Sequence, residues 1–205
     1  MKSKKTQNRF VDLILFFGVA VVVIYIVAAT TKTFNDPITL VLLFLFIIPT
    51  IIALVHGAPF VPTPIVRVQK MLALAKIKPG DKVYDIGCGD GRIVYLAAKE
   101  YGAKAVGFEL SPVVYMLARI RKILWRSKAK IYFRDSRRKN LSDANVIFCY
   151  LMPDTLAKLQ SKFEQELKPG TRIVSYAFPI GTLTPSHVEP KDPAANHATI
   201  YVYTI

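Results

Sequence analysis

Residues 83–91 read VYDIGCGDG, in which three apolar residues and one acid pass directly into three closely spaced glycines. Because glycine has no Cβ, Gly87 and Gly89 allow the backbone to turn sharply and let a ligand come close. Gly91 allows a close entry into the segment that follows, which has a helical pattern. The stretch therefore predicts a ligand-binding turn between a first strand and its helix.

The acids of this turn limit which ligand it suits. A dinucleotide motif would need a third glycine where the chain has Arg92, and no Gly-Lys-Ser/Thr follows as in a phosphate loop. Asp85 and Asp90 would repel a pyrophosphate, and they suit a ligand that carries a cation. An amino group or a sulfonium is such a cation.

Two further acids follow predicted strands. Glu109 ends the second strand, where a carboxylate can accept hydrogen bonds from both hydroxyls of a ribose. Its alternative role is that of an exposed acid at a helix start. Asp135, after the third strand, is placed to receive an adenine amino group, and its alternative is an ion pair with Arg134 or Arg137.

Outward from this turn, strands and helices alternate, which predicts an α/β fold with a parallel sheet and helices on both faces. The expected helices are residues 65–75, 91–101, 112–125 (capped by Ser111) and 154–167. The expected strands are residues 82–86, 104–109, 130–134, 145–150 and 172–176. Two last strand candidates, near 183–188 and 198–204, have no helix between them and predict a terminal antiparallel hairpin.

The first part of the chain has two long apolar runs, residues 11–29 and 38–55. The first contains nineteen residues, roughly 28 Å of helix, which is close to the thickness of a bilayer's hydrocarbon core. The second carries no charge and contains Pro49, which transmembrane helices tolerate. The alternatives are a cleaved signal peptide for the first run and a buried core helix for the second.

The charges around these runs predict their orientation. Lysines and an arginine precede the first run, and Arg67 and Lys70 follow the second, so both flanks are expected in the cytoplasm. We expect a membrane anchor over residues 1–56, a proline-rich linker over 57–64 and a cytoplasmic domain over 65–205.

Charge and cysteine content indicate which kinds of partner and metal site to expect. The net charge of +14 indicates anionic lipid, nucleic acid or acidic partners without choosing among them. Residues 119–139 hold ten Lys or Arg and one acid, interleaved with aromatics, so this basic stretch is a solvated face, a lipid-facing surface or a nucleic-acid surface. The two cysteines, Cys88 and Cys149, predict reduced thiols and no zinc site.

The motif DIGCGDG, with Glu109 downstream, resembles the class I, seven-strand methyltransferases that use S-adenosylmethionine (SAM). PFVPTP, VGFELSP, LKPGTRIVSYAF and NHATIYVY look like one group among them. It comprises the archaeal broad-specificity protein-lysine methyltransferases and the mitochondrial lysine methyltransferases of ATP synthase and the adenine nucleotide translocase. The resemblance implies a Rossmann-like sheet, SAM as cofactor, no metal, and Val61, Pro62 and Thr63 lining the pocket.

The acceptor is less clearly indicated. Residues 135–137 and 149–153 depart from the mitochondrial pattern, which leaves the substrate open. The segment 150–153, Tyr-Leu-Met-Pro, lacks the Asn/Asp-Pro-Pro-Tyr that many base-modifying enzymes use, so nucleic acid is disfavoured. We expect lysine of a membrane or membrane-proximal protein as acceptor, with RNA or a small molecule as the alternative.

Tyr150 is the candidate for orienting the amine of the acceptor, and its alternative role is ordinary core packing. The expected apolar channel comprises Phe148, Tyr150, Met152, Tyr176 and Phe178.

Overall fold

The computed structural model describes residue 37 and residues 60–195 and 197–205. The chain divides into two compact units, residues 1–48 and 49–205, and the fold below is that of the second. The predicted spans 11–29 and 38–55 lie outside the described residues. None of the helices that are described is long and apolar enough to cross a membrane.

A seven-stranded mixed sheet forms the centre of this unit, in the order β3-β2-β1-β4-β5-β7-β6. Five strands run parallel, and β7 pairs antiparallel with both β5 and β6. The predicted parallel sheet with an antiparallel terminal hairpin is therefore confirmed. The strands are β1 (Lys82–Ile86), β2 (Lys104–Glu109), β3 (Lys130–Phe133), β4 (Val146–Cys149), β5 (Arg172–Tyr176), β6 (His187–Glu189) and β7 (Ile200–Thr204).

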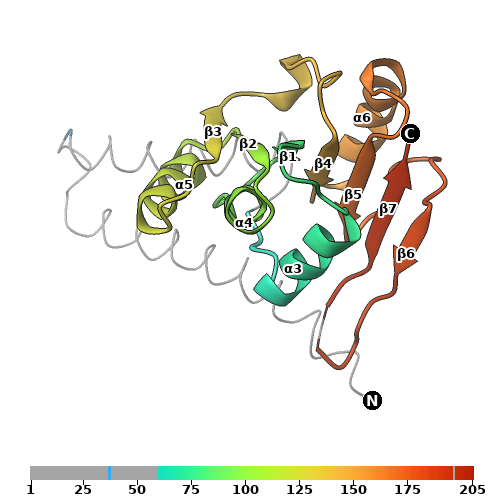
Figure 1. Ribbon diagram of the computed structural model, residues 1–205, viewed down its shortest axis with the longest axis horizontal. Helices are drawn as coiled ribbons and strands as arrows, with labels where there is room; N and C mark the ends of the chain where they lie inside the picture. The colour runs from blue at the N-terminus through green and yellow to red at the C-terminus, as the bar shows by residue number, and fades with distance from the viewer. Residues whose placement is uncertain (1–36, 38–59, 196) are drawn as a thin grey trace. The chain divides into compact units, whose positions relative to one another are not determined.

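Among the described residues, four helices cover the two faces of the sheet (Figure 1): α3 (Ile65–Leu74), α4 (Arg92–Glu100), α5 (Pro112–Leu124) and α6 (Pro153–Glu166). Alternate residues of each strand point to opposite faces, so the core has two halves. Val83 belongs to the half that contains residues of α3, α4 and α5, whereas its neighbour Tyr84 belongs to the half that contains residues of α6. Between β3 and β4 the chain makes only a short 3-10 turn, η2 (Ser136–Arg138).

The prediction was wrong at the start of the last hairpin. A strand was expected near residues 183–188, but β6 begins at His187. A turn precedes it, in which the Leu183 N–H donates to the Ile180 carbonyl. Pro185 has no N–H to give to a ladder, and this explains why pairing begins only after it.

The strand order places the ligand site. β1 lies between β2 and β4, so the strands that follow it in the chain are placed first on one side of β1 and then on the other. Ligands of such sheets bind beyond the carboxyl ends of the strands, where the order reverses. Ile86, the last residue of β1, is in register with Phe108 on β2 and Cys149 on β4. The segments that follow these three strands therefore emerge side by side.

Candidate active site

The turn after β1 is built by glycines in the left-handed region of backbone space. Gly87, Gly89 and Gly91 have φ of 77°, 56° and 81°. A Cβ placed on Gly89 would lie 2.7 Å from the ring of Phe60, so a side chain at this position would displace that ring. The turn is also tied to β2, because the N–H groups of Gly87 and Cys88 both donate to the Phe108 carbonyl.

Glu109, at the end of β2, lies in direct contact with this turn. Its Oε2 accepts a hydrogen bond from the Gly89 N–H at 2.9 Å, and its Oε1 accepts from the N–H groups of Leu110 and Ser111. Burial raises the pKa of Glu109, and the three backbone donors oppose that rise. A carboxylate has about four lone-pair sites, so acceptor capacity remains for a ligand hydroxyl.

Asp85 is a buried acid that the turn leaves without a partner. Its side chain is only 3% exposed, and no hydrogen bond to its carboxylate comes from the part of the chain that the structure describes. Burial, then the nearby Glu109 and Asp90, hold the pKa of Asp85 well above its usual range. A ligand cation beside this carboxylate would offset both its desolvation and its repulsion by the two nearby acids. The site therefore favours a positively charged group.

Asp90, in contrast, already has cationic partners. Its carboxylate accepts from the Arg92 guanidinium, at 2.9 Å from Nε to Oδ1 and 2.5 Å from Nη2 to Oδ2, and it also pairs with Arg121. Arg92 Nη1 in turn donates to the carbonyl of Thr63 at 2.5 Å. Asp90 therefore anchors the guanidinium that holds the segment before α3.

The segment 60–64 lies against the glycine turn at two points. One is the Phe60 ring over Gly89, and the other is the Thr63 carbonyl on Arg92. Thr63 is buried and Pro62 is exposed. Direct contact of Pro62 and Thr63 with a cofactor stays a prediction, but the segment stands where it can cover the turn.

Asp135 makes the ion pair that was its alternative role. It caps η2 by accepting from the Arg137 N–H at 2.9 Å, and it pairs with the Arg137 guanidinium at 2.7 Å. The hydrogen bond from Arg137 lowers the pKa of Asp135. Because β3 is in register with β2, Asp135 lies one strand away from Glu109. Its contact with adenine stays a prediction.

Tyr150 begins the segment after β4 and packs edge-on against Tyr176, with ring centroids 5.0 Å apart. Burial, with Tyr176 second, raises the pKa of Tyr150, so its phenol keeps its proton at neutral pH. The next residue, Leu151, lies over Gly87, and a Cβ added at Gly87 would come within 2.9 Å of the Leu151 side chain. Of the other expected channel residues, Phe148 is fully buried in the core and Met152 is 45% exposed.

Four residues that shape this site were not predicted from the sequence: Phe60, Arg92, Arg121 and Leu151. Arg92 stands where a dinucleotide motif has glycine. This departure excluded the motif but did not indicate that Arg92 contacts Asp90 and Thr63. Arg121 lies 31 residues from Asp90 and carries no local signal. Both cysteines are free and buried, and no cluster of three or more metal-ligating side chains occurs among the described residues.

The strand order, the glycine turn and the carboxylate at the end of β2 define a Rossmann-like, SAM-dependent methyltransferase. The structure is similar to the crystal structure of an RNA methyltransferase from Salinibacter ruber bound to S-adenosyl-L-homocysteine. The TM-score is 0.65 at 35% identity, over 71% of this chain and 94% of that one.

Residues 85–187, half of the chain, match the family model described as the ANTKMT methyltransferase domain. A protein-lysine N-methyltransferase of Saccharolobus islandicus is 41% identical over 74% of this chain and 96% of its own length. The human lysine N-methyltransferase of ATP synthase is 35% identical over 63% of this chain, which spans 56% of that protein. The chain belongs to the ANTKMT methyltransferase family, and its cofactor is SAM.

The residues at the strand ends fit this cofactor. The buried carboxylate of Asp85, to which no described residue donates a hydrogen bond, suits the amino group or the sulfonium, and Glu109 has remaining acceptor capacity for ribose hydroxyls. Glycines at 87 and 89 leave the backbone open to close approach.

Proposed function

We propose that this chain transfers a methyl group from SAM to lysine side chains of a membrane or membrane-proximal protein. The observation that carries the choice of lysine is the similarity to the Saccharolobus islandicus protein-lysine N-methyltransferase over nearly that protein's whole length. The lysine methyltransferases of ATP synthase and of the adenine nucleotide translocase, each similar over more than half of this chain, support the same acceptor.

Bound SAM supplies a methyl group that its sulfonium has already activated, so the protein mainly positions the reactants. In this proposal Asp85 binds the amino group, Glu109 binds the ribose hydroxyls and Asp135 binds the adenine amino group. The glycines at 87, 89 and 91 let the backbone approach, while Asp90, Pro62 and Thr63 organise the covering segment.

A lysine acceptor must lose its proton before it can react. With an ordinary pKa near 10.4, forming the neutral amine at pH 7 costs about 4.6 kcal/mol. Desolvation between aromatic side chains lowers that cost, and the contacting rings of Tyr150 and Tyr176 offer such surroundings. The neutral Tyr150 phenol can accept a hydrogen bond from the amine N–H and so aim the nitrogen's lone pair.

The membrane part of the proposal rests on sequence. The apolar runs 11–29 and 38–55 are long enough for two spans, and the basic flanks favour a cytoplasmic catalytic domain. Tethering raises the local concentration of a membrane substrate. We expect the full chain to resist alkaline extraction from membranes. Its catalytic domain should be accessible to protease from the cytoplasmic side only. Release into the soluble fraction would contradict it.

A second candidate is methylation of RNA. It is favoured by the similarity to the Salinibacter ruber enzyme, whose structure is that of an RNA methyltransferase, and by the basic residues 119–139. The sequence of residues 150–153 argues against base methylation, as it has no amide-Pro-Pro-Tyr.

Radiolabelled SAM separates the two candidates. The purified full chain, incubated with membranes and extract, should label material that protease destroys and nuclease leaves intact, and hydrolysis should yield methyl-lysine. The Glu109→Ala variant serves as the background. Label that nuclease removes would favour RNA and contradict the lysine proposal.

A further inference from the structure

Helix α5 exposes most of its apolar side chains. Of its thirteen residues only Ala118 is fully buried. Six apolar residues on the helix are 40–75% exposed and recur at helical spacing: Val113, Met116, Leu117, Ile120, Ile123 and Leu124. Spacings of three and four residues place them along one stripe, which a helix packed in a soluble core would bury. An exposed stripe of this kind marks an interaction surface.

The charge around this stripe has a single sign. Residues 110–134 contain seven Lys or Arg and no acid. Arg121 pairs with Asp90, but Lys122, Arg126 and Lys128 form no salt bridge with any residue that the structure describes. The apolar stripe is therefore bordered by cations that are available to an anionic partner.

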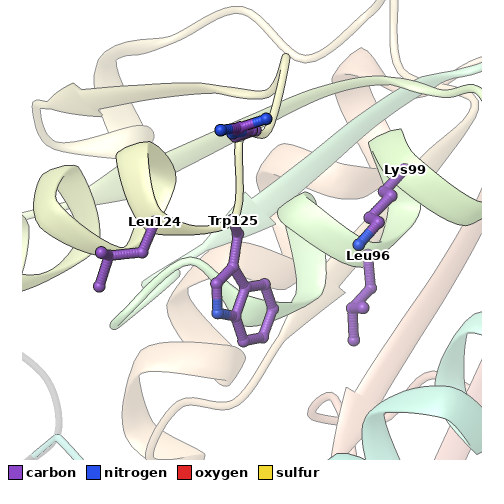
Figure 2. A pocket seen from close by; sticks show the side chains of 5 residues that line it. Leu96, Lys99, Leu124 and Trp125 are labelled. Carbon is purple, nitrogen blue, oxygen red and sulfur yellow. The ribbon is translucent and has the colours of Figure 1, made fainter.

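A shallow pocket continues the stripe at the end of α5. It is lined by Leu96 and Lys99 from α4 and by Leu124, Trp125 and Arg126. Figure 2 shows the Trp125 indole between Leu124 and Leu96. Apolar walls with two cationic side chains match a phospholipid, whose phosphate meets the cations while its glycerol and upper acyl chains meet the apolar surface. Tryptophan is the side chain most typical of that depth in a bilayer.

We propose that the α5 stripe and this pocket dock on an anionic phospholipid bilayer. Interfacial helices combine an apolar face with lysine and arginine in this way, and each cation near an anionic membrane strengthens the attraction. A second copy of the chain would bring two cationic surfaces together. RNA would be attracted by the cations, but its binding would leave the apolar stripe exposed to water.

The surface lies on the helix that begins at the cofactor site. Glu109 accepts the N–H of Ser111, the residue that caps α5, and the helix is roughly 20 Å long. With α5 lying along the bilayer, the rim at Glu109 opens close to the headgroups. The membrane surface would then orient the active site toward lysines near the bilayer, beyond what tethering alone provides.

The only tryptophan of the chain, Trp125, reports on this surface directly. We would reconstitute the full chain in bilayers of phosphatidylcholine, with and without phosphatidylglycerol. The expected result is a blue-shifted emission in the anionic bilayers and quenching by lipids with brominated acyl chains. The double variant Lys122→Glu/Lys128→Glu should abolish the shift. Its matched control, Lys158→Glu/Lys168→Glu, places the same charge change in and just after α6, on the other face of the sheet, and should leave the shift intact.

Unchanged emission in anionic bilayers, or equal loss of the shift in both double variants, would overturn the proposal. A shift produced by RNA and not by lipid would overturn it in favour of a nucleic-acid surface. SAM affinity, measured on every variant, separates this failure from failure of the proposed catalytic function, because the substituted lysines lie outside the cofactor site.

Discussion

The backbone N–H of Gly89 donates a hydrogen bond to Glu109 Oε2 at 2.9 Å, which joins the turn after β1 to the end of β2. The same carboxylate accepts two N–H groups at the start of α5. One side chain therefore fixes the relative positions of a glycine turn and a helix start. The protein's own hydrogen bonds therefore hold both edges of the cofactor site, which lowers the cost of ordering them on binding.

Gly89→Ala should weaken SAM binding. The residue has a φ of 56°, where a side chain costs roughly 1–2 kcal/mol, and the added Cβ would meet the Phe60 ring at 2.7 Å. Gly170→Ala is the control, because Gly170 also has a positive φ but no atom near its Cβ position. Calorimetric titration should show weaker affinity for Gly89→Ala alone, and equal affinities would contradict the role of this turn.

Asp85→Asn should make the free protein more stable and SAM binding weaker. The native state holds the Asp85 proton more tightly than the unfolded chain does. Ionising Asp85 therefore lowers the free energy of unfolding as pH rises from the usual carboxyl range to its raised pKa. Asn removes that loss, so the melting temperature of the ligand-free protein should rise and depend less on pH.

The same shift predicts proton release on binding. A SAM cation favours ionised Asp85, so affinity should increase as pH rises through the pKa of the ligand-free protein. Calorimetry in buffers of different ionisation enthalpy should show protons leaving the wild type and fewer leaving Asp85→Asn. Identical proton counts in the two proteins would remove Asp85 from the cation site.

Arg92→Gln should loosen the segment 60–64. The Arg92 guanidinium joins the Asp90 carboxylate to the Thr63 carbonyl, and hydrogen bonds of charged groups contribute about 1.5–3 kcal/mol. Hydrogen exchange in this segment should accelerate, and SAM affinity should fall roughly tenfold or more. Arg121→Gln is the comparison, since Arg121 contacts Asp90 but makes no hydrogen bond to Thr63. Similar exchange in both variants would argue against the Arg92 link.

Tyr150→Phe should reduce turnover and leave SAM affinity unchanged. The hydroxyl is proposed to orient the acceptor amine, a contribution of about 1 kcal/mol, or several-fold in kcat. Tyr176→Phe keeps the edge-on ring contact and removes only the hydroxyl that accepts the Ala198 N–H, so it should affect kcat less. Wild-type turnover in Tyr150→Phe would reduce this residue to core packing.

The parts of the fold that sequence predicted best are those with strong local signals. The bounds of β1, β2 and β5 agree with the predicted residues 82–86, 104–109 and 172–176. Each is a short run, mostly apolar after its first residue, that lies next to glycine, proline or charged turn residues. β6 carried a weaker signal, because its residues are mostly exposed and a proline-containing turn precedes it.

The contacts that complete the site could not be read from sequence. Local pattern placed Gly89 and Glu109 at adjacent strand ends, but it gave no reason to bring Phe60 over Gly89 or Arg121 onto Asp90. The exposed face of α5 is a similar case. Periodicity predicts a helix with one apolar side, whereas the sheet and the neighbouring helices decide how much of that side is covered.

Calorimetric titration of SAM into Glu109→Ala tests whether the strand ends at Gly89 and Glu109 bind SAM. Glu164→Ala, an exposed acid on α6, is the matched control, and circular dichroism checks that each variant is folded. Glu164→Ala should bind SAM with wild-type affinity, and folded Glu109→Ala should show no measurable binding. Wild-type affinity in folded Glu109→Ala would exclude this carboxylate from the SAM site.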